Sequence, residues 1–190
     1  MGYSPAVTAV RILDAEQAPL LARRYYADGD PGPLVAALAQ VPELLTTALP
    51  FIGTVLGASA IDVRTKEIVI VRTSALQRCR YCVQTHTVVA LDAGLSRDEV
   101  GALRGDGPAE EAFADPRERA LLAWIDAVAG ETGPVGDAPT AAVQRHWVDH
   151  EIVELTAVIG ATMMLNRFAT ALRLPTSSQT VDRLVAEGLH

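Results

Sequence analysis

The sequence predicts an all-α protein, and we expect residues 1–190 to form a single helical domain. Hydrophobic residues make up 49% of the 190 positions but aromatic residues only 5%, so small and aliphatic side chains supply most of the apolar volume. Such a composition is typical of closely packed helices. The chain also lacks the alternating apolar and polar runs that strands of a half-buried sheet need. Its length is sufficient for one sizeable hydrophobic core.

The charge pattern argues against several classes of partner. The formal net charge is −7, and the basic residues are scattered singly or in pairs, which does not favour binding to nucleic acid or to an anionic membrane. No uninterrupted apolar stretch reaches transmembrane length, and Arg11, Asp14 and Glu16 interrupt the N-terminal region before a signal-peptide core could form. We therefore expect a cytoplasmic protein, whose thiols are kept reduced.

The first 41 residues are expected to be an extension that precedes the main helical core. Residues 1–13 have no clear period and are expected to lie as an arm on the body or on a neighbouring subunit. A helix is predicted from about Ala15 to Tyr26. After a turn rich in Gly and Pro over residues 28–33, a short helix is predicted from Leu34 to Gln40.

The next two helices are predicted from their starting residues. Pro42 is expected to open a helix that Pro50 kinks or divides, followed by an irregular connection over residues 53–59. Asp62 is a candidate N-cap for a helix from Val63 to about Leu76. The run IVIV at 68–71 is also compatible with a buried strand, but neither side of it offers a partner strand, so a helix is preferred.

The remaining helices follow from capping residues, prolines and apolar spacing. A helix of about Tyr81–Ala93 ends at Gly94, and Ser96 with Glu99 forms a capping box for a short helix. Three further helices are predicted from a capping residue or a proline at or near the first turn. One begins at Asp115-Pro116, a short one runs from Thr140 to Trp147, and a long one of about His150–Leu172 is capped by Asp149. An amphipathic helix of about Gln179–Leu189 is predicted last. The long helix is apolar over most of its circumference and contains Gly160, which predicts a central position or a subunit interface and thus an oligomer.

The stretch from Glu67 to His86 carries the candidate chemistry. It contains the only cysteines, Cys79 and Cys82, and His86 follows four residues later. On a helix these three positions share one face, so the two sulfurs can meet as a disulfide and His86 lies one turn from Cys82. The N-terminus of that helix, with Arg78 and Arg80 nearby, would favour the thiolate and lower the cysteine pKa. His86 could then accept the thiol proton, and Glu67 could orient His86.

Alternative interpretations remain open at this point. The cysteines could be ordinary small core residues, or Cys79, Cys82, His86 and Glu67 could bind zinc. Glu67 alone would be interpreted as a solvated residue of a first helical turn. Elsewhere we expect roles without chemistry, namely surface positions for His146 and His150, core filling by Met163 and Met164, packing by Trp124 and Trp147, and a structural hydrogen bond between helices for Asn166.

The pattern E-x11-C-x-x-C-x3-H, followed by ALDAGLSRDEV, resembles the superfamily of alkyl hydroperoxidase D-like (AhpD-like) and carboxymuconolactone decarboxylase proteins. The segments DPRERALLAWIDAV (115–128) and EIVELTAVIGATMMLNRFATAL (151–172) extend the similarity, which covers roughly residues 42–175. The resemblance implies an all-helical fold assembled as a homo-trimer or homo-hexamer. Tyr81 stands where alkyl hydroperoxidase D proteins carry a histidine.

The resemblance also implies roles by position. Cys82 matches the peroxidatic cysteine, Cys79 matches the resolving cysteine, and His86 and Glu67 match the proton relay. A peroxide substrate and a dithiol reductant protein, thioredoxin-like or lipoyl-bearing, are implied, with no cofactor beyond the Cys79–Cys82 disulfide and no metal. The leading hypothesis is thus a peroxidase-like thiol oxidoreductase. The alternatives are a lactone decarboxylase or isomerase that uses Glu67 and His86 as acid and base, and a non-enzymatic module that senses redox state or binds zinc.

Overall fold

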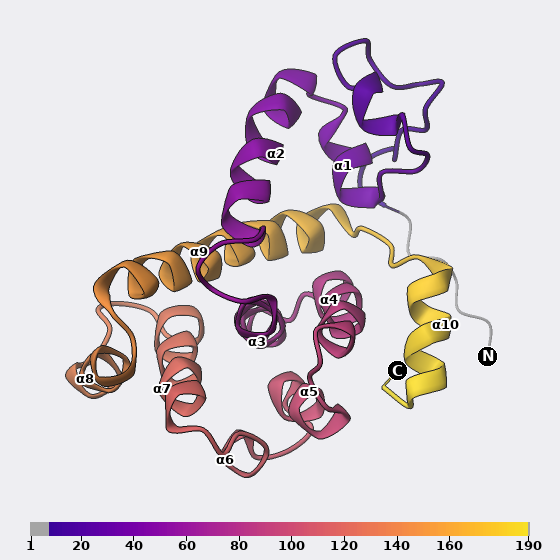
Figure 1. Ribbon diagram of the computed structural model, residues 1–190. Helices are drawn as coiled ribbons and strands as arrows, with labels where there is room; N and C mark the ends of the chain where they lie inside the picture. The colour runs from indigo at the N-terminus through magenta and orange to yellow at the C-terminus, as the bar shows by residue number, and fades with distance from the viewer. Residues whose placement is uncertain (1–7, 190) are drawn as a thin grey trace.

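The computed structural model describes residues 8–189, and within this range every regular element is helical, which confirms the all-α fold (Figure 1). This described range contains two short non-α helices, a 3-10 turn at Arg23–Tyr26 and a π-helical extension of α7 at Asp126–Gly130. The α-helices are α1 (Pro33–Leu38), α2 (Pro42–Leu56), α3 (Val63–Leu76), α4 (Arg80–Asp92), α5 (Arg97–Arg104), α6 (Ala109–Ala112), α7 (Pro116–Ile125), α8 (Asp137–His146), α9 (Asp149–Leu172) and α10 (Ser178–Glu187).

Helix α3 lies at the centre of the fold. It packs against α4, α5, α7 and α9, and Figure 1 shows these helices around it. Its residues 68–71 are all buried, as expected for a helix that is surrounded on all sides. The possible strand at IVIV is therefore helical, because its hydrophobic side chains serve several neighbouring helices at once.

Helix α9 crosses the fold beside α3 and α2. By length and composition it could span a membrane, but the same test is passed by the core helix of a soluble protein. Leu155, Val158 and Ile159 are fully buried in the main hydrophobic cluster. The apolar character of α9 is thus used, at least in part, for packing within this chain.

The predicted helix from Ala15 to Tyr26 is wrong. This segment forms turns that end in the 3-10 helix, because Pro19 lacks the backbone N–H that a continuous helix needs. The Tyr26 hydroxyl instead donates a hydrogen bond to the carbonyl of Leu13, at 3.0 Å. Of the predicted arm, residues 1–7 lie outside the described range, whereas residues 8–13 are irregular and rest on the body through an Ala9 N–H donated to the Leu172 carbonyl at 3.0 Å.

Pro50 neither divides α2 nor is followed by the irregular segment expected from residue 53. The helix continues to Leu56, and only residues 57–62 connect it to α3. Pro50 is exposed, so water can replace the hydrogen bond that its missing N–H would have donated. The side chains of Thr47 and Thr54 add hydrogen bonds to the carbonyls of Glu43 and Pro50, at 3.1 and 2.8 Å.

Most predicted helix starts are confirmed and a few are shifted. The Thr65 N–H donates to the Asp62 side chain at 2.8 Å, and both hydrogen bonds of the capping box of Ser96 and Glu99 are present. Helix α8 begins at Asp137, earlier than predicted, and α6 was not predicted at all. Asp149 is the first residue of α9 rather than its cap; Glu151 instead accepts the N–H of the capping residue Val148, at 3.1 Å.

Candidate active site

The two cysteines form a disulfide at the start of α4, with their Cα atoms 5.3 Å apart. Cys79 is the N-cap of the helix, and its sulfur accepts the backbone N–H of Cys82 at 3.3 Å. The N–H of Cys79 in turn donates to the Ser74 carbonyl at the end of α3, at 3.0 Å. As expected, both sulfurs therefore lie at a helix N-terminus, where unpaired N–H groups and the helix dipole stabilise a thiolate.

The disulfide is packed in a small apolar cluster between α4 and the end of α9. Cys79 is 1% exposed and Cys82 6% exposed. Ala37, Ala169 and Leu174 are the other buried members of this cluster. Few solvent molecules can therefore contact the sulfur atoms directly.

Glu67 and His86 form a hydrogen-bonded pair across the interface between α3 and α4. The Nδ1 atom of His86 lies 3.0 Å from one carboxylate oxygen of Glu67 and 3.3 Å from the other. The Glu67 side chain is only 7% exposed, so its interpretation as a solvated residue is wrong. Because a carboxylate only accepts hydrogen bonds, Nδ1 is the donor in this contact, and Nε2 is the ring nitrogen left available as a base.

No hydrogen bond between His86 and Cys82 is among the interactions of the described residues. Cys82 and His86 do lie one turn apart on α4, as their spacing predicted, but the contact of His86 Nδ1 is with Glu67. The His86 side chain is 26% exposed, so it can also contact solvent or a small molecule. Its location suits a proton transfer near Cys82 without a direct bond in the disulfide form.

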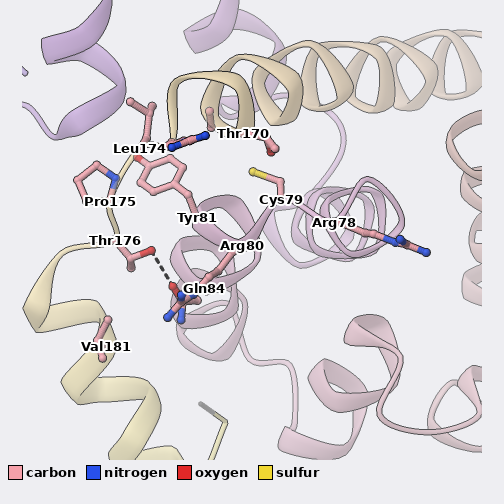
Figure 2. A pocket seen from close by; sticks show the side chains of 12 residues that line it. Arg78, Cys79, Arg80, Tyr81, Gln84, Thr170, Leu174, Pro175, Thr176 and Val181 are labelled. Carbon is pink, nitrogen blue, oxygen red and sulfur yellow. Dashed lines mark hydrogen bonds between the residues drawn. The ribbon is translucent and has the colours of Figure 1, made fainter. Parts of the chain in front are cut away.

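A cavity of about 410 Å³ lies beside Cys79 (Figure 2). Its walls come from the start of α4, the last turn of α9 and the connection to α10. The Thr176 hydroxyl donates to the Gln84 side chain at 2.7 Å and fixes this connection over α4. Partial burial raises the pKa of Tyr81, another lining residue, although a hydrogen bond with Thr85 lowers it in part.

Several residues of the cavity could not be identified from the sequence. Thr170, Arg173 and Thr176 follow Cys79 by about ninety residues and belong to no motif. Only the packing of α9 and α10 beside α4 brings them to the disulfide. No local signal in the sequence could have indicated this proximity.

The residues to which no chemistry was assigned mostly have the expected roles. Asn166 is 1% exposed and accepts the Ser74 hydroxyl hydrogen bond at 3.1 Å, which links α9 to α3. His146 and His150 are exposed on separate helices, as predicted. Met164, however, is 48% exposed and fills no core, whereas Met163 does pack against the main hydrophobic cluster.

The zinc alternative requires several ligands to converge on one point. Within residues 8–189, no three His, Cys, Asp or Glu side chains are grouped so that they could hold a metal ion.

Trp124 and Trp147 have the packing roles predicted for them. Their ring N–H groups donate hydrogen bonds to Thr156 Oγ1 at 3.1 Å and to the Arg117 carbonyl at 3.2 Å, respectively. The candidate chemistry is thus concentrated at the disulfide, the Glu67–His86 pair and the adjoining cavity.

Comparison with known proteins points to one superfamily. The sequence profile of the carboxymuconolactone decarboxylase family matches residues 42–127. A protein of unknown function from Agrobacterium tumefaciens, described as a putative antioxidant defence protein AhpD, is 28% identical, with a TM-score of 0.67 over 74% of this chain and 95% of that chain. No curated protein matches the sequence.

Two more distant structures share the fold over nearly the whole length. An uncharacterized peroxidase-related protein from Ralstonia eutropha, described as an alkylhydroperoxidase AhpD core, is 17% identical and has a TM-score of 0.80 over 93% of this chain and 96% of that chain. The debrominase Bmp8, in complex with 2,3,4-tribromopyrrole, is also 17% identical and has a TM-score of 0.76 over 95% of this chain and all of that chain. At these identities the similarity concerns the fold.

Proposed function

We propose that this chain, which is similar to the AhpD-like and carboxymuconolactone decarboxylase superfamily and has an intact cysteine pair, is a thiol peroxidase that reduces organic hydroperoxides or hydrogen peroxide. The observation that supports this most is the hydrogen-bonded pair of the buried Glu67 with His86, which lies one helical turn from Cys82. A carboxylate, an imidazole and a thiol at a helix N-terminus are the groups that nucleophilic thiol catalysis requires.

In the proposed reaction, the Cys82 thiolate attacks one oxygen of the peroxide and the O–O bond breaks. Cys82 becomes a sulfenic acid, and the leaving alkoxide takes a proton to become an alcohol. The Cys79 thiolate then attacks the Cys82 sulfur, water leaves, and the Cys79–Cys82 disulfide forms. Two electrons from a thiol donor later restore both thiols.

We assign the proton transfers to His86 and its orientation to Glu67. Glu67 accepts the Nδ1–H bond of His86 and so keeps Nε2 available as a base, first for the Cys82 thiol proton. The protonated imidazole can then deliver a proton to the leaving alkoxide. Both steps need His86 to reach a proton near Cys82, directly or through one water molecule.

Other features of the proposal extend the similarity to the superfamily. We propose a homo-trimer or homo-hexamer in the cytoplasm, consistent with the exposed apolar side chains of α2 and α9, among them Phe51 at 51% and Val153 at 70% exposure. In a reducing compartment the disulfide would be a transient catalytic state rather than a permanent staple. The mass of the protein in solution, measured by light scattering, tests the assembly.

Peroxide consumption by the purified protein, with dithiothreitol as electron donor, tests the function. We expect Cys82→Ser to abolish turnover and to give no sulfenic acid adduct with dimedone. Cys79→Ser should lose the disulfide step but accumulate a dimedone adduct on Cys82. An exposed arginine variant, Arg145→Gln, serves as the control with unchanged turnover. Full turnover in both cysteine variants would refute the proposal.

A decarboxylase or isomerase remains the alternative, because the matching family profile is named after such an enzyme. In that reaction Glu67 and His86 would act as acid and base, and the cysteines would be dispensable. Lactone turnover that survives in Cys82→Ser, without peroxide consumption by the unmodified protein, would favour it. A brominated pyrrole should be included as a third substrate, since a debrominase shares this fold.

A further inference from the structure

Two arginines occupy backbone conformations that usually require glycine. Within residues 8–189, Arg78 and Arg173 are the non-glycine residues with positive φ, at 55° and 54°. Arg78 follows the end of α3, and Arg173 is the C-cap of α9. In both cases the next N–H donates to a carbonyl five residues earlier, at 3.0 Å, as in glycine-terminated helices. A strained backbone at two related positions calls for a functional explanation.

Both arginines line the same cavity, next to Cys79. A third arginine, Arg80, also lines it, and no Asp or Glu is among its lining residues, although the whole chain has a net charge of −7. Elsewhere, arginines such as Arg64, Arg72 and Arg97 form ion pairs. In the described part of the chain, neither Arg78 nor Arg173 has an ion pair or a side-chain hydrogen bond. Figure 2 shows the Arg78 side chain directed away from Cys79 and Tyr81, so Arg173 is the unpaired arginine that the cavity offers to an anion.

Helix stability alone does not explain these positions. A cation near a helix C-terminus interacts favourably with the helix dipole, but an arginine in the last helical turn would provide this charge without a left-handed backbone. Glycine would provide the left-handed backbone without strain. Arginine at position 173 instead brings a positive charge to the lining of the cavity.

The cavity contacts Cys79, whereas Cys82 is not among its lining residues. Figure 2 shows Cys79 between the N-terminal end of α4 and Thr170 of α9. A nucleophile that enters the cavity would thus meet the sulfur of Cys79 first. Because Cys79 is only 1% exposed, a small molecule can approach it more readily than the surface of another protein. The cavity volume of about 410 Å³ is in the range of small-molecule sites.

We propose that this cavity is the site of the electron donor, and that Arg173 selects a small thiol that carries a carboxylate or another anionic group. The inference rests on the thiol redox chemistry proposed above and specifies its donor. The donor thiolate attacks the Cys79 sulfur, the Cys79–Cys82 bond breaks, and Cys82 leaves as a thiolate. A second donor thiolate attacks the donor sulfur of this mixed disulfide, which releases Cys79 and yields the donor disulfide. Two electrons pass to the protein, and two donor thiols become one disulfide.

The test measures reduction of the oxidised protein without any peroxide, so a failure of the peroxidase proposal would not affect it. 3-Mercaptopropionate and its neutral amide form a matched pair of donors, with rates normalised to the thiolate concentration. We expect Arg173→Gly to slow reduction by the carboxylate donor at least tenfold and reduction by the amide less than twofold. Arg173→Lys should restore most of the rate, and Arg145→Gln should leave both rates unchanged.

The glycine variant also guards against loss of folding, because glycine suits the left-handed backbone of position 173 and should keep or raise the melting temperature. Octanoate and inorganic phosphate are then added as inhibitors of the reduction, to identify the type of anion that the cavity binds. Inhibition of the carboxylate donor by either anion, lost in Arg173→Gly, supports the site and distinguishes an organic carboxylate from a phosphate group. Equal effects of Arg173→Gly on both donors, or inhibition by neither anion, would overturn the proposal.

Discussion

Lys66 and Glu67 are neighbours on α3, and both carry buried charged groups, but their surroundings differ. The Lys66 amine donates to the carbonyls of Val55 at 3.0 Å and Gly57 at 2.6 Å, and it forms an ion pair with Glu154 at 2.9 Å. Three donors thus meet three acceptors. The Glu67 carboxylate has one hydrogen-bond partner, His86, whose second ring nitrogen has no protein partner among residues 8–189.

The difference shows that burial of a charge does not by itself indicate function. Each of the three donors of the Lys66 amine has a partner. The amine thereby holds together the end of α2, the connection after it and α9, so its role is structural. The Glu67–His86 pair is partly satisfied and leaves a basic nitrogen free for a proton. Incomplete hydrogen bonding, rather than burial, separates the candidate catalytic pair from the structural one.

The largest expected effect comes from Lys66→Met. The substitution leaves two carbonyls and Glu154 without their cation, so we expect a loss of about 3 kcal/mol in the free energy of unfolding. Urea denaturation measures this change. The turnover of the remaining folded protein should stay within twofold of the unmodified protein, and a large loss of turnover at full stability would contradict the structural role.

Glu67→Gln should have the opposite effect, with a large loss of turnover and little loss of stability. Glutamine can still accept the Nδ1–H bond, so the free energy of unfolding should change by about 1 kcal/mol or less. The loss of the negative charge that stabilises the protonated imidazole should lower kcat about 100-fold, or about 2.7 kcal/mol in activation free energy. Single-turnover peroxide reduction measures this effect, and a kcat close to normal would remove Glu67 from the proposed relay.

Asp62→Ala should affect the two environments equally. Asp62 caps the first turn of α3, which carries both Lys66 and Glu67, through the bond to the Thr65 N–H at 2.8 Å. Loss of an N-cap side chain costs about 1 kcal/mol. Thermal unfolding should show this decrease, with kcat unchanged; Asp98→Ala, at an exposed position in the first turn of α5, is the control.

The smallest expected effect is a decrease of the free energy of unfolding at low pH. The hydrogen bond from Ser59, together with Lys66, holds the pKa of Glu154 below its ordinary value. A depressed carboxyl pKa contributes stability that is fully present above the unfolded-state pKa of about 4.3 and is lost as the pH falls through the folded pKa. The free energy of unfolding should thus decrease below about pH 4, and this decrease should be smaller in Glu154→Gln. Identical pH profiles for the two proteins would show that the pair has no such role.

The two environments also differed in how far the sequence predicted them. The cysteines, His86 and Glu67 lie within twenty residues, so helical spacing and the superfamily pattern are enough to bring them together. The partners of Lys66 come from α2, its following connection and α9, and no local pattern indicates them. The same limit applies to Arg173, whose position beside Cys79 depends on how α9 packs.

Helix boundaries were predicted well where one side chain caps one turn, as at Asp62 and Ser96. They failed where the backbone responded to its surroundings. Pro50 stayed within α2 because it lies on an exposed side of the helix, where water can replace the missing backbone hydrogen bond. Pro19 instead prevented the helix predicted after Asp14. The same residue type therefore had different outcomes that depended on tertiary context.

The Cys79 sulfur, which caps α4, also links the oxidation state of the cysteine pair to a backbone hydrogen bond. The Cys82 amide donates to a disulfide sulfur in the oxidised protein, at 3.3 Å, and reduction would turn this acceptor into a thiol or a thiolate. A charged sulfur accepts hydrogen bonds more strongly than a neutral one. The chemical shift and exchange rate of this single amide would therefore follow the electron content of the protein, without any label attached to the cysteines.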